Sequence, residues 1–226
     1  MSKNILSFLI IIGLCSAVFT PLFVHFPFLQ DTFTDESLFL ETTTMLLYVI
    51  GVVIAGVVVK HATSKITRRH GFFVGAASLF WFLEETSFGR DFFYRYDRPE
   101  FYGMKLDSVH DLVELGVRMA KDNTKDFESI FFFAMVGAVI AVLLFFAWQN
   151  RDKLITFCKT PSAVFIIIGL VALIVAGAID VAVERDQEFL IYLEELFEFY
   201  AAVAMVFAAW ILLKDNFTLA EKDRDA

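Results

Sequence analysis

The feature that most constrains this chain is a series of apolar runs that are too long for the core of a soluble protein. A run of about 18 or more apolar residues is long enough to cross a lipid bilayer as an α-helix. Of the 226 residues, 58% are hydrophobic and 28 are Phe, which suits a surface that faces lipid. We expect an all-α integral membrane protein with six transmembrane helices, at residues 5–28, 37–59, 71–88, 130–148, 163–180 and 189–213.

Six spans use most of the chain, so we expect one membrane domain over residues 1–226 and no separate soluble domain. The first run follows Lys3 and has the apolar character of a signal peptide. This character continues from Val18 to Phe28, however, which favours a retained helix. Residues 89–128 form one long connection, which we expect to be an outward-facing interfacial segment.

The orientation of the chain follows from the charges of its loops, because cytoplasmic loops carry an excess of Lys and Arg. The loops after the second and fourth predicted spans are basic, whereas the connections after the first and fifth are mainly acidic. Both termini are therefore expected in the cytoplasm. The charges behind this prediction are Lys60, Lys65, Arg68, Arg69, Arg151, Lys153 and Lys159 on the inner side, and Asp31, Asp35, Glu36, Glu184, Asp186 and Glu188 on the outer side.

The net charge of −8 does not indicate a nucleic-acid partner, because the basic residues are dispersed over the inner loops. Cys15 and Cys158 are the only cysteines of the sequence, so a disulfide framework or a Cys-type zinc site is not expected. The expected partners are membrane lipid and either a second copy of the chain or another membrane protein.

The outward segment has its own organisation. It opens with the aromatic and basic stretch 90–98, whose rings suit the level of the lipid headgroups. After Pro99 and Gly103, apolar residues recur at helical spacing, which predicts a short amphipathic helix. His110 and Glu114 are four residues apart and share one side of it.

Acidic residues fall at the outward ends of several predicted spans. An ionised group in hydrocarbon costs roughly 2.5–3.5 kcal/mol on insertion scales, and acids four residues apart project in one direction and repel each other. We therefore expect a cation, a proton or a water-filled cavity to compensate them. The acids are Glu41 in the second span, Glu84 and Glu85 in the third, Asp180 and Glu184 at the fifth, and Glu194, Glu195 and Glu198 in the sixth.

A simpler interpretation competes with this one. Carboxylates near the interface can be solvated at little cost, and Glu184 and Glu188 fit that description. His110 on an amphipathic helix is more often a surface or packing residue than a ligand. The hydroxyls of residues 42–44 are able to satisfy Glu41.

Two stretches of the chain carry a resemblance to a known family. They are Glu84-Glu85-Thr86-Ser87-Phe88-Gly89-Arg90 and Asp107-Ser108-Val109-His110-Asp111. Together they resemble an uncharacterised group of bacterial multi-pass membrane proteins with a Glu-Glu-Ile-Ser-Trp-Gly-Gln-Arg signature and a later Asn-Leu-His-Asn. The acidic motif of residues 35–41 and the Glu-Glu-x-x-Glu pattern of residues 194–198 are also similar to that family. The resemblance implies location in a bacterial inner membrane but no known activity.

The chain departs from this signature at several places. Phe88 stands for Trp, Arg90 for Gln, Asp91 for Arg and Asp111 for Asn. The positive charge moves by one position, which leaves open the acid with which Arg90 pairs.

A second resemblance, to the membrane proteases with a Glu-Glu-x-x-x-Arg motif, implies a Glu-dependent and His-dependent hydrolase. Arg90 is one residue too far from Glu85 for that motif, which turns it by about 100° on a helix. His110 and Glu114 imitate one of the missing motifs. The hydrolase therefore stays an alternative, as does a structural subunit of a membrane complex.

The sequence thus predicts an outward-facing site that binds or moves a divalent cation or protons. Oxygen-rich sites with one imidazole suit Mg, Ca, Mn, Fe or Zn. The candidate metal or proton ligands are Glu84, Glu85, His110, Asp111, Glu194, Glu195 and Glu198, with Glu41, Arg90, Asp180 and Glu114 as supporting residues.

Overall fold

The fold of the chain is all-α, as predicted, apart from one very short pair of strands. The computed structural model describes residues 3–26, 39–86, 100–101, 104–105, 115–117, 119, 127–182 and 187–222. These residues belong to two compact units, Met1–Glu85 with Pro161–Ala226, and Thr86–Thr160.

Four helices of the first unit are long and apolar enough to cross a membrane. They are α1 (Lys3–His25), α3 (Phe39–His61), α8 (Pro161–Ala182) and α9 (Glu188–Lys222), with candidate spans at Lys3–His25, Phe39–His61, Pro161–Asp180 and Glu188–Thr218. They confirm four of the predicted helices, because each overlaps one of the apolar runs of the sequence. The total of six spans stays a prediction.

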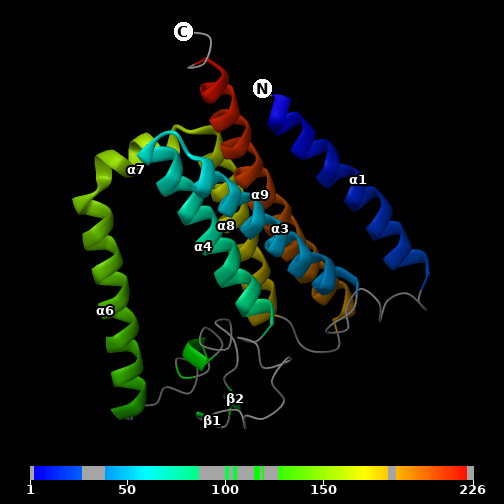
Figure 1. The fold of residues 1–226 in the computed structure, drawn as a ribbon. Coiled ribbons are helices and arrows are strands. Elements are labelled where there is room, and N and C mark those ends of the chain that lie inside the picture. Colours follow the sequence, from blue (N-terminus) through cyan, green and yellow to red (C-terminus); the bar gives the residue numbers. More distant parts are fainter. Residues whose placement is uncertain are drawn as a thin grey trace. The chain divides into compact units, whose positions relative to one another are not determined.

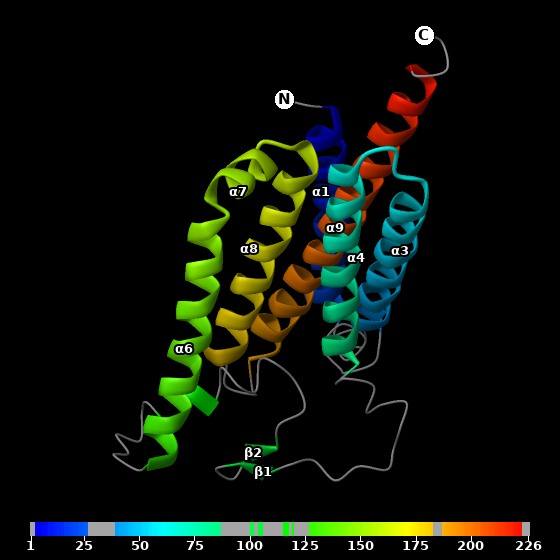
Figure 2. The same ribbon diagram turned by 60° about the vertical axis from the view of Figure 1, so that its left-hand side comes forward.

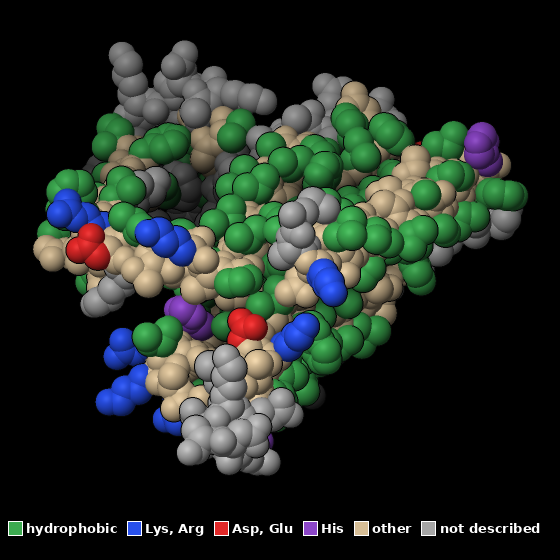
Figure 3. Space-filling model, turned by 90° about the horizontal axis from the view of Figure 1, so that it is seen from above, with side chains coloured by type: hydrophobic (Ala, Val, Ile, Leu, Met, Phe, Trp, Pro, Cys, Tyr) green, Lys and Arg blue, Asp and Glu red, His purple; other side chains and the backbone are tan. Residues whose placement is uncertain are grey.

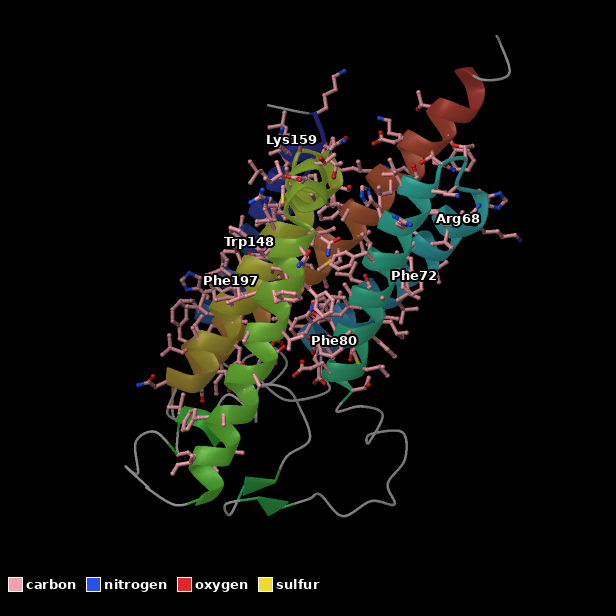
Figure 4. All side chains as sticks on the ribbon, turned by 90° about the vertical axis from the view of Figure 1, so that its left-hand side faces the viewer. Arg68, Phe72, Phe80, Trp148, Lys159 and Phe197 are labelled. Atoms are coloured by element: carbon pink, nitrogen blue, oxygen red, sulfur yellow. The ribbon has the colours of Figure 1, made fainter. Side chains whose placement is uncertain are left out.

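The predicted third span lies in α4 (Lys65–Glu85), which is not among these four. Its first turns carry Arg68 and Arg69 and its last turn carries two acids, so only Gly71 to Leu83 is free of charge. At about 1.5 Å per residue, that stretch is shorter than the roughly 30 Å of a hydrocarbon core. Figure 4 shows Arg68 near the start of α4 and Phe72 and Phe80 farther along it.

The core of the first unit is built around α9, which lies between α8 and the α3–α4 pair and contacts all three helices (Figures 1 and 2). Of its most apolar stretch, 67% is buried, against 6% for α1. The buried part of α9 is rich in Ala, and the ideal Cβ position of Gly169 in α8 lies 3.3 Å from the carbonyl oxygen of Ala201. Small residues of this kind let helices approach closely where lipid supplies no hydrophobic driving force.

Helices α3 and α4 form an antiparallel hairpin along a seam of small residues. A Cβ on Gly51 would lie 2.9 Å from the Ser78 hydroxyl, and one on Gly71 would lie 2.9 Å from Val58. At these glycines the two helices are so close that an added Cβ would displace a side chain of the neighbouring helix. Phe72 and Phe73, on the other side of α4, are exposed.

Helix α1 is held by a few side chains rather than by a continuous face. Phe8 packs edge-on against Phe165 of α8, and Phe23 stacks on Tyr192 of α9. Two hydroxyl pairs add to these ring contacts: Ser16 Oγ bonds Tyr200 OH, and Thr20 Oγ1 bonds Tyr192 OH at 3.0 Å. Because most of α1 is exposed, this helix offers its remaining apolar surface to lipid.

At the opposite end of α9, Asn216 binds the turn between α3 and α4. Its Oδ1 accepts the backbone N–H of Thr63 at 3.1 Å, and its Nδ2 donates to the carbonyl of His61 at 2.9 Å. Asn216 is only 1% exposed, so these bonds satisfy polar atoms that water does not reach. The start of α1 and the end of α9 lie at this same end of the unit (Figure 1).

The second unit contains α6 (Phe127–Gln149), which covers the predicted fourth span, and the short helix α7 (Arg151–Cys158). The sequence did not predict α7, which occupies the basic loop after that span. Strands β1 (Glu100–Phe101) and β2 (Met104–Lys105) pair antiparallel in the predicted interfacial segment. Residues 115–117 and 119 are helical, and the remainder of the predicted amphipathic helix lies outside the described residues.

The Asn216 bonds generate a prediction on stability. Replacing Asn216 by Ala leaves the Thr63 N–H and the His61 carbonyl buried without their partner, so we expect a loss of about 1–3 kcal/mol in the free energy of unfolding. Denaturant unfolding of the purified protein in detergent measures it. Thr218→Ala is the matched control, because Thr218 bonds only the Lys214 carbonyl of its own helix. Equal stability of the two variants contradicts the role of Asn216.

Candidate carboxylate site

The predicted acids of the third and sixth spans lie on two neighbouring helices. Glu84 and Glu85 end α4, and Glu194, Glu195 and Glu198 follow one another within the first turns of α9. Glu84 is buried, with 8% of its surface exposed, and the other four are half-buried. Because α4 and α9 are in contact and run in opposite directions, the end of one meets the beginning of the other (Figure 2).

Glu198 is the residue around which these acids gather. The carboxylates of Glu85, Glu195, Glu194 and Glu84 all act on it electrostatically. Within the part of the chain that the structure describes, every group that acts on Glu198 in this way is therefore of the same sign. Five acids from two helices thus form one cluster, which we call the carboxylate cluster: Glu84, Glu85, Glu194, Glu195 and Glu198.

A tyrosine that the sequence analysis did not select lies against this cluster. Tyr48 of α3 has an exposed fraction of 0%, and Glu85, Glu198 and Glu84 act on it electrostatically. Side chains of a helix point back toward its N-terminus, which for α3 is the end where α4 finishes and α9 begins. The Tyr48 ring therefore extends from the middle of α3 toward the acids.

Three hydroxyl groups near the cluster are buried without a partner. Thr44 Oγ1, Tyr48 OH and Ser78 Oγ each belong to a residue that is 0% exposed, and none of them finds a hydrogen-bond partner within the described residues. Burying a hydroxyl in this state costs about 1–3 kcal/mol in proteins. A polar ligand that reached these hydroxyls would remove this cost.

These hydroxyls occupy one half of the α3–α4 seam. Thr44 and Tyr48 share the face of α3 that continues to Gly51, and Gly51 faces Ser78 of α4. Beyond this point the seam consists of Ala55 against Gly75 and of Val58 against Gly71. It is therefore polar from the acidic ends of the helices to Ser78, and apolar and closely packed from there to the basic turn.

The supporting residues of the prediction are placed less centrally. Glu41 lies in the first turn of α3 and Asp180 near the end of α8, and both are half-buried. Neither is among the described groups that act on Glu198. Arg90, His110, Asp111 and Glu114 lie outside the described residues, so their proposed roles stay predictions.

The spacing of the acids bears on metal binding. Among the described residues, no group of three or more His, Cys, Asp or Glu side chains is arranged as metal ligands would be. The carboxylate cluster is thus close enough for its charges to interact without forming a finished coordination shell.

Tyr48 does not belong to the residue types, acids, His and Cys, that mark a cation site in a sequence. Its signal is the pair Thr44 and Tyr48, which stand four residues apart on one face of an otherwise apolar run.

Comparison of the chain with protein-family models, curated proteins and solved structures gives no match. The resemblances to the bacterial multi-pass family and to the membrane proteases therefore stay predictions.

If Glu85 and Glu198 repel each other, changes at the two positions are not additive. At alkaline pH, Glu85→Gln and Glu198→Gln are each expected to stabilise the protein, because each removes one of two repelling charges. The double variant should gain less than the sum, with a coupling on the order of 1 kcal/mol measured by thermal or denaturant unfolding. The control pair is Glu188→Gln with Glu198→Gln, since the exposed Glu188 lies about 15 Å from Glu198 along the axis of α9. Additive effects in both pairs contradict the cluster.

Proposed function

We propose that this protein is a multi-pass membrane protein that binds or moves a positively charged ion, either protons or a divalent cation, at the carboxylate cluster. The observation that carries the proposal is the convergence of four carboxylates on Glu198. Ionised acids so close together in an apolar helix bundle repel, and uptake of positive charge relieves that repulsion.

The depth of Glu198 supports this function over a ring of solvated acids. Glu198 lies about 15 Å along α9 from Glu188, at about 1.5 Å per residue, and the hydrocarbon core is roughly 30 Å thick. A carboxylate at an interface would lie within the first turn of the span. Glu198 lies beyond it, on a helix that is buried by its neighbours.

In this proposal α4 and α6 complete six spans, residues 89–128 face outward with their amphipathic helix, and both termini face the cytoplasm of a bacterial cell. The directions of the helices in the first unit support the common side of the termini. Figure 3 looks toward the end of the first unit where α3 turns into α4, and residues 60–70 of this turn include Lys60, Lys65, Arg68 and Arg69 and no Asp or Glu. An excess of basic residues is typical of a cytoplasmic side.

The residues of the cluster would act as ligands or proton carriers. His110 and Asp111 would add a ligand or a gate from the outward segment, and Arg90 would balance charge. Carboxylate oxygens suit Mg, Ca or Mn, and an added imidazole admits Fe or Zn.

The decisive variant is Glu198→Gln, which keeps the shape of the side chain and removes its charge. Repulsion destabilises the folded state when all five acids are ionised, so the unfolding midpoint of the wild type should rise as protons or a divalent cation bind. The same addition should have a much smaller effect on Glu198→Gln. Thermal unfolding across pH and across Mg, Ca, Mn and Zn concentrations measures both.

The matched control is Glu188→Gln, which changes an exposed acid at the start of the same helix and should behave as the wild type. The proposal fails if pH and all of these ions shift the unfolding midpoint of the wild type no more than that of Glu198→Gln. A response to metal alone, or to pH alone, identifies the ion.

The orientation is testable through the native Cys158, which is exposed near the end of α7. In a Cys15→Ser background, a membrane-impermeant maleimide should label Cys158 in inverted vesicles and not in intact cells, because the basic loop is expected inside. A cysteine at Lys105, in the predicted outward segment, should give the reverse. Labelling of Cys158 in intact cells would show that the orientation is the reverse of the predicted one.

A further inference from the structure

We propose that Tyr48 is a binding residue of the carboxylate site. Its hydroxyl oxygen and the carboxylates of Glu198 and Glu85 bind the same positively charged ligand, one that prefers oxygen donors. This inference rests on the proposed function and extends it from the acids to a neutral donor on a third helix.

The first argument is position. Glu85, Glu198 and Glu84 act electrostatically on Tyr48, so the hydroxyl lies on the side of α3 that meets α4 and α9. The Asn216 contact with Thr63 and His61 sets α3 and α9 parallel, with His61 near the level of Asn216. Counting back 13 residues along both helices brings Tyr48 to about the level of Val203, roughly 7.5 Å nearer to the Asn216 end than Glu198. The side chain of Tyr48 points back toward the start of α3, and so toward the level of Glu198.

The second argument is that Tyr48 differs from Tyr192 and Tyr200, the two tyrosines of α9. Tyr192 and Tyr200 each bond a hydroxyl of α1. Tyr48 OH is fully buried and has no hydrogen-bond partner among the described residues, although acids lie around it. A buried phenol normally has a partner, so we expect the ligand of Tyr48 to bind on the side of the hydroxyl that faces the acids.

The third argument concerns the class of ligand. The described polar atoms that meet here are oxygens: carboxylates from α4 and α9 and hydroxyls from α3 and α4. Oxygen donors suit a hard cation or a protonated water, and they do not favour soft metals. Ser78 adds one more hydroxyl along the α3–α4 seam, and beyond it Ala55 packs against Gly75.

The charged and titratable groups around Glu198 are known for each helix that packs on α9. On α4 they are Glu84 and Glu85, and on α3 it is Tyr48. Glu41 of α3 and Asp180 of α8 lie at the same end of their helices but are not among the described groups that act on Glu198. Helix α1 has no carboxylate; its titratable groups are Lys3, Cys15 and His25. Among the described titratable groups that interact with Glu198, Tyr48 is therefore the one with a neutral oxygen donor.

The test is Tyr48→Phe, which keeps the ring and its packing and removes the oxygen. Thermal unfolding is followed during titration with Mg²⁺, Mn²⁺, Ca²⁺ or Zn²⁺ at fixed pH, and with protons in the presence of a chelator. We expect the wild-type response to need about tenfold more of the effective ion in Tyr48→Phe, which corresponds to the loss of one ligand-bearing hydrogen bond or coordination bond. A merely structural role would lower the starting midpoint and leave this concentration unchanged.

Tyr200→Phe is the control, because it removes a hydroxyl that is bonded to Ser16 and faces α1. It should respond to the ion as the wild type does. A Tyr48→Phe variant with the wild-type ion dependence overturns the inference while leaving the proposed function in place, provided that Glu198→Gln has lost the response. If Glu198→Gln keeps the response, the proposed function itself fails.

A second measurement covers the case in which Tyr48→Phe does not fold. Infrared difference spectra of the wild type, labelled with ring-¹³C tyrosine, should show a tyrosine band when the ion binds. The band should disappear in Glu198→Gln and persist in Tyr200→Phe. Absence of any tyrosine band during binding overturns the inference.

Discussion

Close contact between helices is the constraint from which the rest of this structure follows. In a bilayer the backbone must satisfy its own polar groups, which leaves helices as the elements, and their association depends on how near they can approach. Here the approach is set by Gly51, Gly71 and Gly75 in the α3–α4 seam and by Gly169 against Ala201. A larger side chain in the seam would separate α3 from α4, and with them Tyr48 from Glu84 and Glu85, whereas a larger side chain at Gly169 would separate α8 from α9.

Much of this architecture could be predicted from the sequence, because hydrophobic length is a local property. The apolar runs predicted α1, α3 and α8 with boundaries within about three residues of those observed, and the beginning of α9, which continues to Lys222 rather than ending at residue 213. The third span is different. The hydropathy pattern predicts that this helix begins at Gly71, whereas α4 begins at Lys65. Lys and Arg are good helix formers, but a hydropathy pattern excludes them from a span. The short helix α7 was missed for the same reason, since its sequence is polar.

The carboxylate site was predictable only in part. Spacing alone places Glu194 and Glu198 on one side of their helix, and the outward ends of the third and sixth spans are expected at the same membrane face. The contact between α4 and α9 depends on the tertiary fold, and so does the position of Tyr48 beside the acids. Neither can be derived from the spacing of residues along the chain. A search for ionisable residues also passes over hydroxyls, which become informative only when burial has removed water from them.

Asn216 gives α9 a fixed point at one end. The helix is tied there to the α3–α4 turn, whereas its acidic beginning is joined to the rest of its unit by helix packing and by the side chains of α1. Glu198 stands about 27 Å from that fixed point along the helix axis. A rigid α9 that tilts by about 5° around Asn216 carries Glu198 through about 2 Å, which is similar to one metal–oxygen bond length. A small change in the tilt of α9 at Asn216 would therefore produce a larger displacement of the acids at the other end of the helix.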